Sequence, residues 1–274
     1  MTDFLMECSI SYPPSMCGFQ KLLTRLASLP SLNTLDMDFM SPRTWTLPMT
    51  FTYLRTLHLS CIEHEPGLCS LPSLPALETL VLNFCCYCLE CPKNGEGPWV
   101  FVHFSRLPRL LSLSITGAQD GSIICCGRAS QLRRLKIAYS SGLDLGAILA
   151  GVGTELEAVH ILDCEFVTEE PTPRTAYPIL KQLTILDAVS GLSTFHLTEL
   201  PSLEELNLRI HPCDLEQLQD WPLIWSFLRC VPVTLWLNSP GPPQVRNDQT
   251  CRLREIASLP NAQLQGQGWL WQTI

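Results

Sequence analysis

The densest cluster of metal-binding residue types in this chain is the cysteine-rich stretch Cys85–Cys91. Within it, Cys88 and Cys91 have the two-residue separation that lets two thiolates bind one zinc ion. A structural zinc site needs four ligands, and no spaced second pair follows, because Cys125–Cys126 is adjacent and His103 is single. We therefore predict a reduced cysteine-rich loop without a cofactor. A metal- or thiol-dependent module that uses this stretch stays as the alternative.

Signatures of catalysis are missing from the sequence. None of the nucleophile-elbow, P-loop, dinucleotide-binding or kinase motifs is present, and the histidines show no paired ligand spacing. With 14 cysteines in the chain, no single one can be chosen as a nucleophile. We predict a protein that is not an enzyme and has no catalytic residues.

Composition narrows the classes of partner. The formal net charge is −8, and an acidic chain repels nucleic-acid phosphates unless it has a strong basic patch. The largest basic cluster is Arg128, Arg133, Arg134 and Lys136, which we interpret as a solvated edge plus one exposed strand position. We predict no binding to nucleic acid.

The start of the chain does not resemble a secretory signal, because residues 1–19 include Asp3, Glu7, Pro13 and Pro14. No apolar stretch approaches the roughly 18 residues needed to span a bilayer. We expect a cytoplasmic or nuclear protein without membrane contact, whose cysteines are mostly thiols.

A repeated phrase, Leu-Pro-x-Leu-x-x-Leu-x-Leu, runs through most of the chain. It begins at Leu29, Leu74, Leu107 and Leu200, and copies that lack the leading Leu-Pro begin at Phe51, Ala129, Gly153 and Tyr177. The central aliphatic residues of these copies are 35, 57, 80, 113, 135, 159, 183 and 206, with gaps of 22, 23, 33, 22, 24, 24 and 23 residues. Such regularity predicts a solenoid.

Each copy predicts one short strand. Residues two apart share a face of a strand, so the last two aliphatic positions of the phrase point inward and the residue between them points to solvent. Equal periods stack these strands in parallel. We expect a ninth copy at Val233–Leu237, with Leu235 as its central residue, a degenerate first copy at Phe4–Ile10, and a weak last turn at Leu259–Leu264.

The phrase resembles the signature of the leucine-rich-repeat family, Leu-x-x-Leu-x-Leu-x-x-Asn/Cys, from about Phe19 to Asn238. The closing cysteine of that signature matches at Cys85 and Cys164. In this respect the chain resembles the intracellular, cysteine-containing class of the family. The resemblance implies an α/β horseshoe with a concave parallel sheet of about eight to ten strands and short irregular or helical convex segments. It further implies a protein-binding module.

Irregular spacing and the phrase LPSLEELNL at Leu200–Leu208 resemble the substrate-recognition repeats of fungal F-box proteins. That resemblance implies part of a ubiquitin-ligase receptor, with a cullin-ligase adaptor as one partner. No F-box is visible, because Gly18–Leu26 already predicts the helix that leads into the first clear repeat. Three alternatives stay open: the F-box is absent, the chain is a fragment or degenerate paralogue, or the resemblance covers the repeats alone.

The outward strand positions are the expected binding surface. They form an acidic end and, farther along, an apolar patch with a polar rim, a composition typical of protein contacts. The residues predicted to bind an unidentified protein partner are Lys136, Ala138, His160, Leu162, Leu186, Arg209 and Trp236.

We expect one domain over residues 1–274, with an N-terminal turn or cap at 1–28, repeats at 29–238 and a C-terminal cap at 239–274. The long gap before Leu113 predicts an insertion at 85–101, whose Trp99 and Phe101 are further candidate contacts. A short helix is expected over Leu143–Val152.

Overall fold

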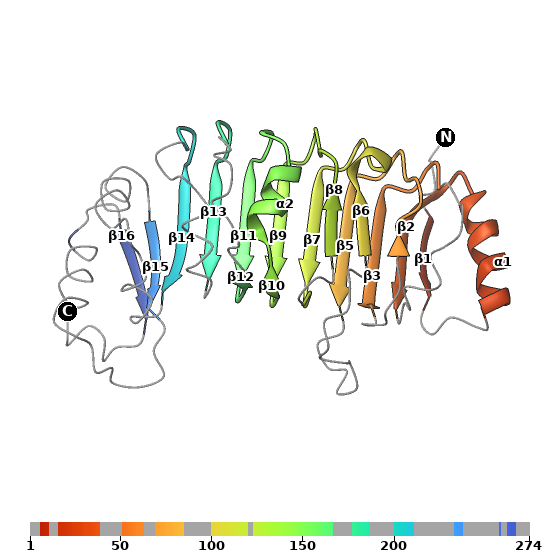
Figure 1. The fold of residues 1–274 in the computed structure, drawn as a ribbon, viewed down its shortest axis with the longest axis horizontal. Coiled ribbons are helices and arrows are strands. Elements are labelled where there is room, and N and C mark those ends of the chain that lie inside the picture. Colours follow the sequence, from red (N-terminus) through yellow and green to blue (C-terminus); the bar gives the residue numbers. More distant parts are fainter. Residues whose placement is uncertain are drawn as a thin grey trace.

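A computed structural model of the chain describes residues 6–10, 16–38, 51–62, 69–84, 100–119, 123–166, 177–186, 200–210, 233–237, 258 and 262–266. Its main feature is one parallel sheet whose strands lie side by side in chain order (Figure 1). The eleven strands of this main sheet are β1 (Met6–Ile10), β2 (Leu32–Asp38), β3 (Thr56–Ile62), β5 (Thr79–Phe84), β7 (Ser112–Thr116), β9 (Arg134–Ala138), β11 (Ala158–Leu162), β13 (Gln182–Leu186), β14 (Glu205–Ile210), β15 (Val233–Leu237) and β16 (Ala262–Gly266).

The protein is therefore a parallel-sheet repeat solenoid, as the spacing predicts. The sheet has one strand more than the upper limit expected from the sequence, because the degenerate first copy and the weak last copy both pair.

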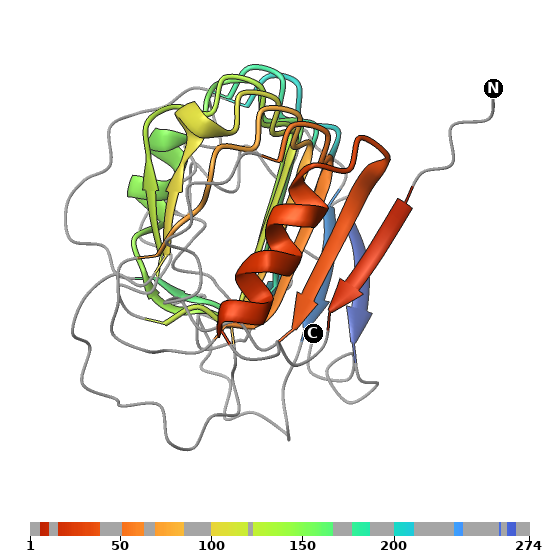
Figure 2. The same ribbon diagram turned by 90° about the vertical axis from the view of Figure 1, so that its right-hand side faces the viewer.

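A second layer faces the main sheet across the core (Figure 2). It is made of short pieces that return the chain from one strand to the next: a three-stranded sheet, a two-stranded sheet, a 3₁₀ turn and a helix. These are β4 (Cys69–Ser70), β6 (Val100–His103) and β8 (Ile123–Cys126), then β10 (Ser141–Leu143) and β12 (Glu165–Phe166), with η2 (Phe104–Arg106) and α2 (Leu145–Gly151). Helix α1 (Met16–Ala27) stands at the N-terminal end and buries Leu23 and Leu26 in the core.

Both helices fall where the sequence predicts them. Asp144 precedes α2, and its carboxylate accepts a hydrogen bond from the Ala147 N–H at 2.9 Å, which satisfies one of the free donors of the first helical turn. At the other end, the Gly151 carbonyl accepts from the Ala129 N–H in the neighbouring repeat. The helix therefore ties two successive repeats together.

The core consists of stacked rows of aliphatic side chains, one from each position of the repeated phrase. The central residues pair with one another along the sheet, as in Leu113 with Leu135 and Leu135 with Val159. The buried members of this row are Leu35, Leu57, Leu80, Leu113, Leu135, Val159, Leu183 and Leu206. Each strand alone is too short to bury these side chains, so the stack of neighbours holds the fold together.

The Leu-Pro pair of the phrase makes a tight turn before the strand. In all four Leu-Pro copies the leucine carbonyl accepts a hydrogen bond from the N–H of the next phrase leucine. The N–H groups of Leu77 and Leu110 donate to Leu74 and Leu107 at 3.1 Å, and those of Leu32 and Leu203 donate to Leu29 and Leu200 at 3.3 Å. Proline suits the position after the first residue of such a turn, because its fixed φ matches the turn geometry. The proline thus sets the direction from which each strand enters the sheet.

A second recurring corner ends the strands. Gly117, Tyr139 and Asp163 have φ values of 71°, 51° and 50°, and each N–H donates to the carbonyl of the last residue in the following strand. The next residues, Ala118, Ser140 and Cys164, are buried and begin the return to the second layer. This is the slot that the sequence signature assigns to asparagine or cysteine. Small side chains fit there, and the Ser140 hydroxyl donates to the Ala138 carbonyl at 2.9 Å.

Candidate interaction surface

The side of the main sheet that faces away from the second layer is called the open face here (Figure 2). All described elements of the second layer lie on the other side. The register of the strands aligns the outward positions in three rows that run across the strands, so side chains from remote parts of the sequence become neighbours. The middle row, for instance, places Ser114, Lys136, His160 and Thr184 on four successive strands.

The N-terminal part of the open face, on β2 to β7, is polar and only half exposed. Its first row consists of small hydroxyl side chains, Thr34, Thr56, Thr79 and Ser112. Contacts there connect strands, as when the Asn83 amide donates to the Ser60 hydroxyl at 3.4 Å. Asp36 lies 4.0 Å from His58, measured from Oδ2 to Nδ1.

Strand β9 presents two cations in the middle of the sheet, where it is sixth of eleven strands. Arg134 and Lys136 are both exposed, and neither forms an ion pair within the described residues. From the sequence, Arg134 is expected at a solvated edge and outside the binding surface. The register shows that it lies in the first row, directly beside Lys136 in the second.

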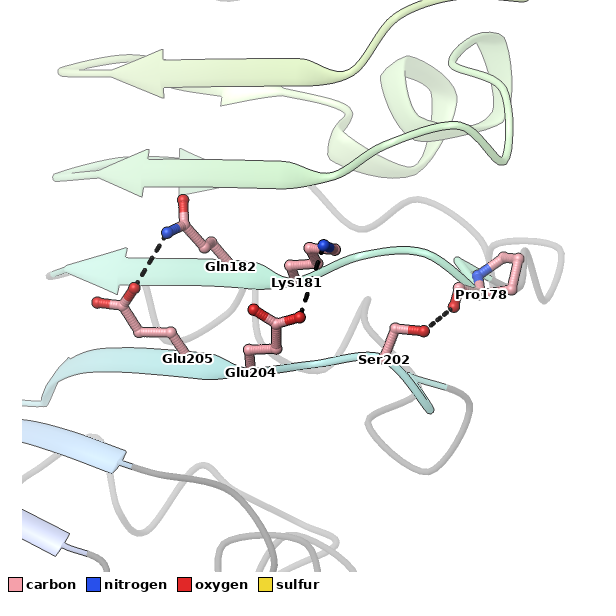
Figure 3. Close-up of polar contacts among 6 residues, drawn as sticks. All are labelled: Pro178, Lys181, Gln182, Ser202, Glu204 and Glu205. Carbon is pink, nitrogen blue, oxygen red and sulfur yellow. Dashed lines mark hydrogen bonds and ion pairs between the residues drawn. The ribbon is translucent and has the colours of Figure 1, made fainter.

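Cations just before the strands behave differently. Arg55 pairs with Glu78 at 3.3 Å, Arg133 with Glu157 at 2.9 Å and Lys181 with Glu204 at 3.6 Å, always across to the next repeat. Figure 3 shows the last of these pairs. The backbone follows the same pattern, because the Lys181 carbonyl accepts from the N–H groups of both Glu204 and Glu205.

Beyond the cations, the third row becomes apolar. Ala138, Leu162 and Leu186 follow one another on β9, β11 and β13, and the two leucines are half exposed. Tyr139 follows Ala138 in the left-handed corner, and it is 62% exposed. We name the set Arg134, Lys136, Ala138, Tyr139, Leu162 and Leu186 the central patch.

Two details of the central patch differ from expectation. Ala138 was expected to be exposed, but it is 1% exposed, because its single methyl group lies between the longer Thr116 and Leu162 on the neighbouring strands. Tyr139 was not predicted at all. The sequence does contain a signal that Tyr139 is unusual at this corner, because the equivalent positions in the neighbouring repeats hold Gly117 and Asp163. Glycine and aspartate tolerate a positive φ far better than an aromatic residue does.

His160 lies beside Lys136 in the middle row and is half-buried. Burial lowers the pKa of His160, and the neighbouring Lys136 ammonium lowers it further, while Glu205 acts in the opposite direction. The imidazole is therefore neutral at physiological pH. The positive charge of the central patch comes from Arg134 and Lys136.

The C-terminal border of the patch is a carboxylate held by amides. The Gln182 side chain donates to Glu205 at 3.2 Å (Figure 3), and the Asn207 side chain donates to the other oxygen of Glu205 at 2.8 Å. Asn207 also donates to the Thr184 hydroxyl at 3.5 Å. These bonds fix the acidic group at the edge of the patch.

Arg209 and Trp236 occupy third-row register positions, paired with Leu186 and with each other. The position of Trp236 corrects the expected alignment of the ninth copy. Val233, not Leu235, pairs with Leu206, so Trp236 is equivalent to Arg209 rather than to Asn207. The connection before β15 has its own length, and an alternating apolar strand gives two equally good registers in sequence.

The predicted insertion residues have different outcomes. Trp99, Cys88 and Cys91 lie outside the described residues. Phe101 was expected in the insertion loop, but it lies in β6 of the second layer, where its backbone pairs with Ile124 and its ring stacks on His103 with centroids 6.0 Å apart. Phe101 therefore belongs to the second layer of a repeat and lies away from the open face.

Cys8, Cys125, Cys126 and Cys164 are free thiols. Burial, with a smaller contribution from Cys126, raises the pKa of Cys125 to about 12. Burial also raises the pKa of Cys164, whose Sγ donates to the Leu162 carbonyl at 3.2 Å. Both thiols are protonated at neutral pH, and a protonated thiol is a poor nucleophile and metal ligand.

Among the described residues, no group of three or more His, Cys, Asp or Glu side chains is placed to hold a metal ion. In the same part of the chain, no helix combines the length and apolarity needed to cross a bilayer. Comparison with known protein families and with curated proteins finds no match to this chain.

Proposed function

We propose that this chain is a non-enzymatic protein–protein interaction module of the leucine-rich-repeat type, which binds its partner on the open face of the main sheet. The observation that supports this is the central patch. On the central strands, two half-exposed leucines lie beside two exposed cations that form no ion pair within the described residues, and exposed Tyr139 follows in the corner after β9. The inward positions of the same strands are uniformly aliphatic. Tyrosine and arginine near the middle of a surface are typical of binding hot spots, and an exposed apolar patch with a polar rim is typical of a protein contact.

The finer proposal is that the module is the substrate-recognition part of a ubiquitin-ligase receptor. The support is the sequence phrase of Leu200–Leu208 and the buried small residues at Ala118, Ser140 and Cys164, the slot of the intracellular repeat signature. On this proposal the chain is curved, with the open face as its concave side, and the cullin-ligase adaptor joins the complex.

Affinity purification from the native lysate tests the binding site. The wild type is compared with the double variant Leu162→Glu/Leu186→Glu and with a control, Thr56→Glu/Thr79→Glu, which adds the same charge to half-exposed positions of the N-terminal strands. All three proteins must have the same circular dichroism spectrum. We expect specific partners to be retained by the wild type and the control and lost by the leucine variant.

Two results would contradict the proposal. Equal retrieval by the leucine variant would remove the open face as the site. Loss in both variants would mean that any added charge disturbs binding, so the central patch would have no special role. The presence of the cullin-ligase adaptor among the retrieved proteins would support the ubiquitin-ligase assignment. Its absence would count against that assignment alone.

A further inference from the structure

The two cations of the central patch differ from the other strand-associated cations because they form no ion pair with any described residue. The cations just before the strands, Arg55, Arg133 and Lys181, are named the strand-entry row, and each pairs with a glutamate of the next repeat. In contrast, Arg134 and Lys136 have no carboxylate partner within the described residues. The nearest carboxylate toward the C-terminal end of the rows, that of Glu205, already accepts bonds from Gln182 and Asn207. The two positive charges are thus available to a ligand.

Geometry relates these cations to the apolar row. Lys136 and Leu162 lie on adjacent strands and two residues apart along them, because Lys136 pairs with His160 and Ala138 pairs with Leu162. Strands about 4.8 Å apart and a rise of about 3.3 Å per residue place their Cα atoms roughly 8 Å from each other. In an extended segment, residues two positions apart are separated by about 7 Å. One such segment can reach both sites with alternate side chains.

The charges around the patch favour one class of ligand. The whole chain has a net charge of −8, and the N-terminal part of the open face presents Asp36 and Asp38. An acidic segment is repelled by most of this protein, so the local positive potential at β9 both attracts it and limits where it can bind.

We propose that the central patch binds an acidic protein segment in which an aliphatic or aromatic side chain lies two residues from a carboxylate. The carboxylate pairs with Arg134 and Lys136, and the apolar side chain lies on Leu162 and Leu186 beside Tyr139. This rests on the proposed function and adds the chemistry of the partner to it.

An array of immobilised synthetic peptides tests the proposal. Each peptide has a Gly/Ser background and two variable positions separated by one residue. The first position is Glu, Gln or Lys, and the second is Leu, Phe or Ser, in all combinations. Binding of the labelled full chain is measured at low and at physiological salt. We expect the strongest signal for Glu with Leu or Phe, and a fall as salt increases, because exposed charges are screened.

Variants with matched charge assign the effect to the patch. Arg134→Glu/Lys136→Glu should weaken binding to the Glu–Leu peptide about tenfold or more. The control Arg109→Glu/Arg128→Glu makes the same change in net charge at exposed cations outside the open-face rows, and it should bind like the wild type. The neutral variant Arg134→Gln/Lys136→Gln should weaken binding to an intermediate degree. All variants should have the same Tm as the wild type, because the substituted side chains are exposed.

The outcomes separate this inference from the function on which it rests. If Leu162→Glu/Leu186→Glu abolishes binding of natural partners while charge reversal has no effect and the array shows no preference for Glu, the open face is the site but its ligand is not acidic. If neither pair of substitutions matters, both proposals fail. The inference would also be overturned if the protein bound a single-stranded RNA oligonucleotide through Arg134 and Lys136 and showed no preference among the peptides.

Discussion

The two parts of the open face are built on the same backbone and carry different surfaces. On β2 to β7 the outward rows are mainly threonine, serine and asparagine, with two aspartates, His58 and Val81, and they are half exposed. On β9 to β13 the same register positions hold Arg134, Lys136, Leu162 and Leu186. The inward rows are apolar throughout and mainly leucine, isoleucine and valine in both parts. Packing against neighbouring repeats constrains the inward positions, whereas outward positions vary freely, so the latter distinguish one part of the solenoid from another.

The largest effect should come from the constant inward row. Leu80→Ala, below the polar part, and Leu135→Ala, below the central patch, each remove a fully buried side chain. We expect each to destabilise the fold by about 2–5 kcal/mol, because a cavity is left in a close-packed core. Denaturant melts of both variants measure this. A much smaller loss for one of them would mean that the two parts are not equivalent in packing.

A smaller loss is expected at Gly153, where the backbones of two successive repeats lie close together. Gly153 takes the position that holds Phe51, Leu107 or Tyr177 in other copies, and a Cβ there would lie 2.8 Å from the Ala129 carbonyl oxygen. Gly153→Ala should therefore destabilise by about 1–3 kcal/mol through a forced backbone shift. Gly151→Ala, whose nearest contact would be 3.3 Å, is the matched control and should lose less in the same thermal melt. Equal losses would show that the backbone can yield at Gly153.

Tyr139 allows stability and binding to be separated. Its φ of 51° is unfavourable for a tyrosine, so Tyr139→Gly should leave stability unchanged or raise it by up to about 1 kcal/mol. Binding of the Glu–Leu peptide should nevertheless weaken, because the exposed ring is lost. Asp163→Gly relieves the same backbone conformation one repeat later without removing a patch residue. Melting curves and peptide titrations of both variants should therefore differ only in binding, and a loss of stability in Tyr139→Gly would refute this account.

The smallest effect concerns the pH dependence of stability. The pKa of His160 is lowered in the folded protein, first by burial and then by Lys136, while Glu205 opposes the shift. A histidine with a lowered folded pKa stabilises the fold above its unfolded value of about 6.5, and this contribution is lost as pH falls below that value. His160→Gln should thus show a smaller drop in Tm than the wild type between about pH 7.5 and about pH 5.5. Parallel drops would mean that His160 is not the group responsible.

Much of the fold could be predicted from the residues because two periodicities agree. The repeat gaps predict a stack of strands, and the alternation within each phrase predicts which side chains enter the core, as Leu135 and Ile137 do on either side of Lys136. Short apolar periodicity is also why the ninth copy was misaligned. Val233, Leu235 and Leu237 alternate equally well in two registers, and only pairing with β14 selects one.

The composition of the surface was less predictable. Phe101 was expected in an inserted loop and lies in the second layer, since a strand of four residues between apolar neighbours has no distinct signal. Arg134 could be recognised as a surface cation, but its place beside Lys136 without a carboxylate partner among the described residues depends on which acids lie on the next strands.

The sequence by itself determined the parallel stack, the identity of the inward rows and the outward positions of Lys136, Leu162 and Leu186, because these follow from local alternation repeated at nearly equal intervals. Only the tertiary structure decided that Ala138 is covered while Tyr139 is exposed. It also decided that the cations of the strand-entry row are paired, whereas those of the central patch have no ion pair within the described part of the chain. The physical reason is that exposure and ion pairing depend on the size and charge of side chains brought alongside from strands more than twenty residues away.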